Sequence, residues 1–94
     1  MHEASLIANL VRQITALAHA HGARRVVGVH IKLGALCHIA PDHFRTHFVY
    51  GTRGTVAEGA QLTIERLTDT VSPLSQEVIL DSIEVVEETS LARD

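Results

Sequence analysis

The first residues, Met1, His2 and Glu3, form the part of this 94-residue sequence best suited to metal chemistry. A histidine beside the chain's amino terminus can bind one ion through the terminal amine, a deprotonated backbone amide and its imidazole, which together close fused chelate rings. Because His2 is bulky, we expect methionine aminopeptidase to leave Met1 and its free amine in place. Closely spaced nitrogen donors of this kind favour square-planar Ni(II) or Cu(II) over tetrahedral Zn(II).

Glu3 adds a backbone amide as a further candidate donor, and its carboxylate could orient or tune the site. The alternative is an ordinary chain start, with the Glu3 carboxylate in the favourable first turn of a helix. Taken alone, three residues favour this alternative, since short motifs often match by chance.

The sequence contains seven histidines, and two of them, His43 and His47, lie four residues apart on a predicted helix. This spacing places both imidazoles on one face, with His38 just upstream. Two ligands without an assured third make a weak metal site, so we interpret the pair as a polar helix face. Whether these three histidines form a second metal site stays open. His19 and His21 are weaker candidates, because alternate residues on a helix point apart.

The remaining reactive side chains suggest structural roles. Cys37, the single cysteine, cannot form an internal disulfide, and we expect a buried small residue rather than a metal ligand. His30 falls on the outer face of a predicted strand. Glu58 lies between turn residues and is expected to cap loop backbone. With no catalytic triad, paired carboxylates or phosphate-binding loop, the sequence does not indicate an enzyme.

Composition limits the function further. The length of 94 residues predicts a single domain spanning 1–94. A net charge of −3 gives no reason to expect nucleic-acid binding, and no apolar run approaches the ~18–20 residues of a membrane span. The first residues lack the basic start of a signal peptide, so we expect a cytoplasmic protein. Because so small a core gives limited stability, a homodimer is possible.

These candidate residues require elements to position them, and the first two elements are a helix and a strand. We predict a helix over about 4–20, ended by Gly22. Its expected buried stripe is Leu6, Leu10, Ile14, Leu17 and His21. Alternation over 24–34 predicts a strand with one buried side. Its expected buried side is Val27, Val29, Ile31 and Leu33, with Val26, Gly28, His30 and Lys32 opposite.

Pro41 begins a second predicted helix, on which Phe44 and Phe48 share the buried face. After a glycine-bearing connection, 51–59, we predict strands over 61–67 and 78–87, joined by a polar loop over 68–77. The expected fold is α/β of the α+β type: a three-stranded mixed sheet with two helices packed on one face. Strand–helix–strand favours a right-handed parallel crossover, with the last strand on an edge.

Several stretches, in this order and spacing, resemble the HypA/HybF family of hydrogenase maturation nickel metallochaperones. They are Met1-His2-Glu3, His21–Val26, Leu33–Leu36, Pro41, Thr52–Ala60 and Ile83-Glu84-Val85. The resemblance covers about 1–67 and 78–87. It implies Ni(II) bound by Met1, His2 and Glu3. It also implies two partners, a HypB-like GTPase and the large subunit of a nickel enzyme such as a [NiFe]-hydrogenase.

One part of the family pattern is missing. Family members carry a zinc domain with two Cys-x-x-Cys pairs between the second and third strands, where this chain has only the cysteine-free loop 68–77. A structural zinc site needs four ligands, so we expect no structural zinc. The leading hypothesis is nickel delivery. The alternative is a metal-independent assembly or regulatory protein that binds the maturation partner.

Overall fold

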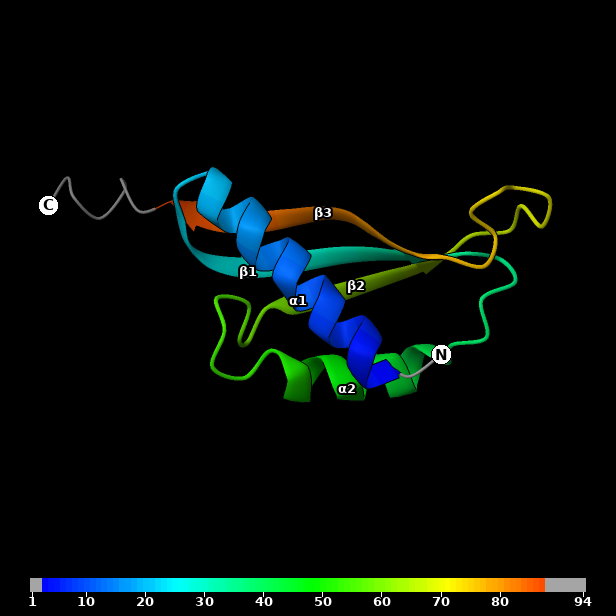
Figure 1. Cartoon of the computed structure of the whole chain (residues 1–94), viewed down its shortest axis with the longest axis horizontal. Coiled ribbons are helices and arrows are strands. Elements are labelled where there is room, and N and C mark those ends of the chain that lie inside the picture. Colours follow the sequence, from blue (N-terminus) through cyan, green and yellow to red (C-terminus); the bar gives the residue numbers. More distant parts are fainter. Residues whose placement is uncertain (1–2, 88–94) are drawn as a thin grey trace, which may run out of the picture.

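A computed structural model describes residues 3–87. The elements, in chain order, are α1 (Glu3–Ala20), β1 (Ala23–Leu33), α2 (Pro41–Gly51), β2 (Gln61–Arg66) and β3 (Val78–Glu87). The strand order is β2-β1-β3, with β1 parallel to β2 and antiparallel to β3 (Figure 1). The predicted α+β class and three-stranded mixed sheet are confirmed.

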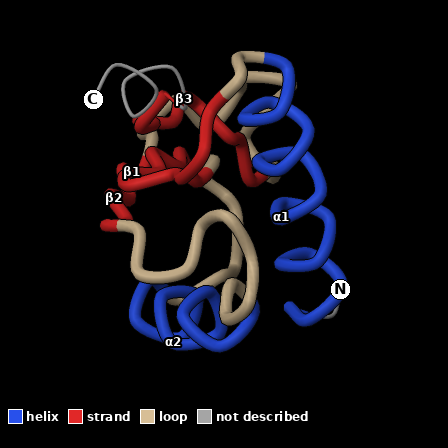
Figure 2. Tube along the Cα trace, turned by 90° about the vertical axis from the view of Figure 1, so that its left-hand side faces the viewer, coloured by secondary structure: helices blue, strands red, loops and turns tan. Residues whose placement is uncertain are grey.

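The two helices share one hydrophobic core with the sheet. α1 crosses the sheet and contacts β1 and β3, while α2 lies across the start of α1, on the β2 side of the molecule (Figures 1 and 2). Phe44 and Phe48 of α2 are 0% and 1% exposed, with ring centroids 6.3 Å apart, as their spacing predicted. Arg45 ties α2 to the edge strand, donating from Nη1 to the Leu62 carbonyl at 2.7 Å.

The buried face of α1 differs from the predicted stripe by about one residue. Leu10 and Ile14 are buried as expected, but the stripe is completed by Ile7 and Ala18. Leu6 is only partly buried, and Leu17 and His21 are exposed. The reason is that α1 packs against α2 as well as the sheet. A Cβ at Gly51 would collide with Ile7 Cγ2, so this contact sets the helix rotation.

A β-bulge corrects the predicted faces of β1. Val26 pairs with Val85 and Gly28 with Glu84, which leaves Val27 as an extra residue. Val26 is therefore fully buried and Val27 is 41% exposed, the reverse of the expected pattern. An extra residue in one strand shifts the alternation of side chains by one position. Beyond the bulge, Val29, Ile31 and Leu33 are buried as predicted, with 0–1% exposure.

The loop between β2 and β3 folds back onto the end of β1. Its backbone is tied to β1 by Gly34 N donating to the Glu77 carbonyl at 2.8 Å and Leu36 N donating to the Ser75 carbonyl at 2.6 Å. Gly34 permits this approach, because a Cβ there would collide with the backbone of Leu74 and Ser75. Over residues 3–87, no helix is long and apolar enough to cross a membrane.

Candidate metal centre

The predicted nickel motif lies at the start of α1. Met1 and His2 fall outside the described residues, and Glu3 is the first residue of α1, with its side chain also outside the description. Ala4 is the first residue whose side chain is described, and it lies in the first turn of α1.

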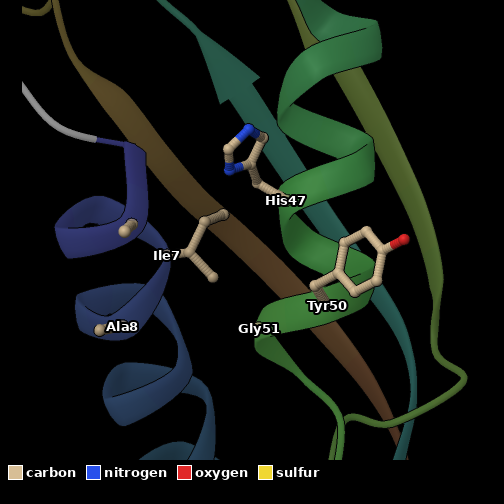
Figure 3. A pocket seen from close by; sticks show the side chains of 6 residues that line it. Ile7, Ala8, His47, Tyr50 and Gly51 are labelled. Atoms are coloured by element: carbon tan, nitrogen blue, oxygen red, sulfur yellow. The ribbon is translucent and has the colours of Figure 1, made fainter.

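A pocket of about 300 Å³ opens beside this first turn. It is lined by Ala4, Ile7 and Ala8 of α1 and by His47, Tyr50 and Gly51 of α2 (Figure 3). The walls are largely apolar, and the imidazole is the only one of these six side chains that is a common ligand of transition metals. Ile7 and Gly51 both line the pocket, and the two helices approach closely there, because a Cβ at Gly51 would collide with Ile7 Cγ2.

The structure separates the two histidines that the sequence grouped together. His47 and His43 are both exposed on α2, but only His47 lines the pocket. In Figure 3 its ring projects from α2 toward the first turns of α1. His38 is exposed in the connection before α2. Within residues 3–87, apart from the Glu3 side chain, no group of three or more His, Cys, Asp or Glu side chains could hold a metal ion.

The other histidines lie elsewhere in the fold. His19 and His21 are exposed near the opposite end of α1, and His21 lines a different groove against β3. His30 lies on the face of the sheet that α1 does not cover, where its Nε2 is 3.4 Å from Oε2 of Glu84. The surface role predicted for His30 agrees with this half-exposed pair.

Cys37 and Glu58 have the structural roles that the sequence indicated. Cys37 is a free thiol and only 8% exposed. Glu58 Oε1 accepts a hydrogen bond from the Gly54 backbone amide at 3.3 Å, so this carboxylate caps its own loop.

Sequence reasoning missed the arginine contacts, and those of Arg66 and Arg53 bear on the connection into α2 and on the pocket. Arg66 donates to the carbonyls of Gly34, Cys37 and Ile39 at 3.4, 3.1 and 2.8 Å, which fixes the connection leading into α2. The Arg53 guanidinium lies 4.5 Å from the ring centroid of Tyr50, which lines the pocket. The Arg53–Tyr50 contact joins residues three apart in the chain, whereas the Arg66 contacts do not follow from local spacing. The partners of Arg66 lie 27 to 32 residues away in the chain.

The described residues define a small α+β domain in which two helices and a three-stranded mixed sheet share one core. The family described as "Hydrogenase/urease nickel incorporation, metallochaperone, hypA" matches residues 1–73. The chain belongs to this HypA family.

Its relatives include hydrogenase maturation factors HypA. That of Chlorobium limicola is 39% identical over 67 residues, which is 71% of this chain and 58% of the relative. That of Methanosarcina mazei is 32% identical over 95 aligned positions, 94% of this chain and 69% of the relative. The chain thus spans little more than half the length of several curated relatives it matches, 58% and 59% for two of them.

A solved structure shows the same fold. The solution structure of the Ni metallochaperone HypA from Helicobacter pylori superposes with a TM-score of 0.81 at 18% identity. The superposition covers 94% of this chain and 100% of that one.

Proposed function

We propose that this chain carries nickel for the maturation of a nickel enzyme and holds Ni(II) at Met1, His2 and Glu3. The observation that carries the proposal is this motif at the start of α1 in a chain of the HypA family. The family description names nickel incorporation, and the relatives are hydrogenase maturation factors.

The chemistry of the motif suits delivery better than storage. Terminal amine, amide and imidazole nitrogens select a square-planar ion. A site at a chain end is also open to an incoming ligand, so a recipient can take the ion one donor at a time. The ion is cargo, and no bond is made or broken in a substrate. A non-enzymatic role agrees with the family and with the residues.

The partners follow from the same family. We propose two partners in the cytoplasm. A HypB-like GTPase promotes the transfer of Ni(II), and the large subunit of a nickel enzyme, a [NiFe]-hydrogenase in the first instance, receives the ion. The support is the name shared by the relatives, "Hydrogenase maturation factor HypA". Urease is the second client, because the family description names it beside hydrogenase.

We further propose that the loop 68–77 stands where relatives carry a zinc domain, and that the domain needs no structural zinc. The sequence has one cysteine, Cys37, which is buried in the core and is not part of this loop. The loop also closes on itself, with Leu74 N donating to Ser72 Oγ at 3.0 Å and Ser75 N donating to the Ser72 carbonyl at 3.0 Å.

The test is a calorimetric titration of untagged protein with Ni(II), wild type against His2→Ala. We expect one tight site in the wild type and its loss in the variant, with the melting temperature unchanged because residue 2 precedes the buried stripe of α1. His21→Ala, an exposed histidine at the other end of α1, is the matched control and should bind as the wild type does. Equal affinities for wild type and His2→Ala would falsify the terminal site. The metal-independent assembly protein would then be favoured.

A further inference from the structure

β3 is an edge strand with a long, regular outer edge. The sheet order β2-β1-β3 pairs β3 with β1 on one side, and no strand of residues 3–87 lies on its other side. A strand paired on one side directs every second backbone N–H and C=O away from its neighbour, where another extended chain can bind. Between Ser82 and Glu87 the extra residues of the register shifts, Arg24 and Val27, belong to β1, so β3 itself continues without a bulge. This half of β3 therefore offers an uninterrupted row of backbone donors and acceptors.

The opposite edge of the sheet is less suited to binding a strand. β2 has six residues, whereas β3 has ten. The Leu62 carbonyl of β2 also accepts a hydrogen bond from Arg45 Nη1 at 2.7 Å, so a side chain of α2 already contacts the backbone of that strand. β3 is therefore the better of the two edges for adding a strand.

A groove runs beside the same half of β3. It has a volume of about 360 Å³ and is lined by Leu17 and His21 of α1 and by five β3 residues in the range 81–87. Among the described residues, its lining comes from α1 and β3 alone, so the groove follows β3 rather than the centre of the sheet. Leu17 is 36% exposed, and Ile83 and Val85 are half-buried. Because side chains alternate along a strand, a chain added to β3 would place every second side chain against this aliphatic wall.

The charge of β3 favours a basic segment. β3 carries three carboxylates, Asp81, Glu84 and Glu87, and no lysine or arginine. Asp81 Oδ1 lies 3.6 Å from Lys32 Nζ, and the Asp81 side chain is 45% exposed. Glu84 Oε2 lies 3.4 Å from His30 Nε2, and the Glu84 side chain is 65% exposed. Exposed pairs of this kind are weak, so these two carboxylates can also meet the cations of a bound chain.

The same charges disfavour a second copy of this chain as the occupant. Charged side chains on an edge strand keep sheets from pairing with themselves. Between two β3 strands no register sets a carboxylate opposite a cation, because β3 has no basic residue. An antiparallel pair centred between Ser82 and Ile83 would set Asp81 opposite Glu84. The edge therefore discriminates against its own copies and in favour of a basic strand.

We propose that the edge of β3 from Ser82 to Glu87, with the groove beside α1, binds an extended segment of a partner protein by β-strand addition. In this segment Lys or Arg alternates with aliphatic residues. The backbone of the segment extends the sheet beyond β3, its aliphatic side chains face the groove, and its cations meet the β3 carboxylates. The inference does not depend on nickel binding, because the surface contains no residue of the amino-terminal motif.

The probe is a short synthetic peptide in which Lys and Val alternate, labelled with a fluorophore and titrated with untagged full-length protein. We expect saturable binding by fluorescence anisotropy, and we expect it to weaken as ionic strength increases. A matched peptide with Glu in place of Lys should not bind. Equal binding of the Glu peptide would overturn the basic character assigned to the partner.

Two protein variants test the two parts of the surface. Glu84→Gln should weaken binding of the Lys–Val peptide by about two- to fivefold, the range of one exposed ion pair. Its matched control is Glu65→Gln, the same exchange at an exposed position of β2, which should bind as the wild type does. Leu17→Gln removes part of the aliphatic wall and should weaken binding by at least about fivefold. Wild-type affinity in both Glu84→Gln and Leu17→Gln would overturn the assigned surface.

The backbone contacts are tested separately from the charges. Backbone amides of β3 that point away from β1 should exchange rapidly with solvent in the free protein and become protected when the peptide binds, as measured by NMR hydrogen exchange. Two further peptides carry N-methyl groups, one on its Val amides and the other on its Lys amides. Only one of these two sets of amides can face β3, so one peptide should bind and the other should not.

The remaining outcomes also decide the proposal. Equal binding of the two N-methylated peptides, or protection confined to elements other than β3, would show that the peptide does not extend the sheet. If sedimentation shows a dimer that the peptide dissociates, a second copy occupies this edge and the proposal is overturned. Because these measurements are made without Ni(II), none of their results changes the test of the amino-terminal site.

Discussion

A groove lined by one histidine lies beside each end of α1, yet the two grooves offer a metal ion different donors. At the start of the helix, His47 and apolar side chains line the pocket next to the amino-terminal motif. At the far end, His21 and Leu17 face β3, whose Asp81 and Glu87 supply carboxylates to the groove. By number of potential ligand side chains, the far groove is the richer of the two.

The far groove nevertheless brings no three such ligands together among residues 3–87, leaving the Glu3 side chain aside. Side chains from separate elements must be placed by packing before they can share an ion, and each placement costs conformational entropy. The terminal motif avoids this cost because its donors are consecutive in the chain. The comparison teaches that covalent adjacency, and not the abundance of histidine, distinguishes the proposed site.

Blocking the terminal amine should reduce Ni(II) binding at the start of α1 more than any other change proposed below. A Gly-Ser-Gly-Ser extension before Met1 turns the amine into an amide and should weaken Ni(II) binding by about a hundredfold, near the upper cost of disturbing a metal site. The same four residues added after Asp94 are the control and should change nothing. Calorimetry on both forms measures the difference. An unaffected extended form would remove the amine from the ligand set.

Acidification should have the next largest effect on Ni(II) binding. Imidazole in water has a pKa of about 6.5, and the amide donor must lose a proton to bind, so the metal competes with protons at each donor. Affinity should therefore fall by about tenfold or more between pH 7.5 and pH 6. Proton release measured by calorimetry in buffers of different ionisation enthalpy checks the mechanism. Affinity independent of pH would contradict nitrogen ligation.

The helix junction that supports the pocket should be sensitive to added volume. Gly51→Val places a side chain against Ile7 and should lower the free energy of unfolding by about 1–3 kcal/mol, the usual cost of overpacking. Denaturant unfolding measures it. Combining Gly51→Val with Ile7→Ala should cost less than the sum of the two single changes, because the colliding side chain is gone. Strict additivity would show that the two residues do not share one contact.

Elements marked by local signals could be predicted from the sequence. Gly22, with a φ of 64°, ends α1, and Pro41 begins α2, because each residue acts through its own backbone geometry. The strand ranges followed from alternation and turn residues in the same way. These signals do not depend on where the rest of the chain lies.

Features that depend on a distant partner could not be predicted. The exposure of Val27 comes from a bulge opposite β3, about sixty residues further along the chain. The choice of Ile7 over Leu6 as the buried residue comes from Gly51. For the candidate site, the motif could be recognised from adjacent residues, whereas the position of His47 on the wall of a pocket depends on the packing of α1 on α2.

The smallest expected effect concerns the loop 68–77, which joins β2 to β3. If this loop replaces a zinc domain, the fold has no metal to lose, so a chelator should leave the melting temperature unchanged. Domains that depend on a structural ion unfold when it is stripped, because binding energy is part of their folding energy. Hydrogen bonds from Gly34 and Leu36 already hold the loop in place.

The measurement is thermal unfolding of purified protein with and without a zinc-selective chelator, together with metal analysis of the same sample. A chelator that also strips the terminal Ni(II) should lower the melting temperature only by the binding contribution of that ion, and His2→Ala removes this contribution from the start. The chelator should therefore have no effect on His2→Ala. A drop of many degrees in His2→Ala, reversed by stoichiometric zinc, would show a structural zinc site and contradict the proposed replacement.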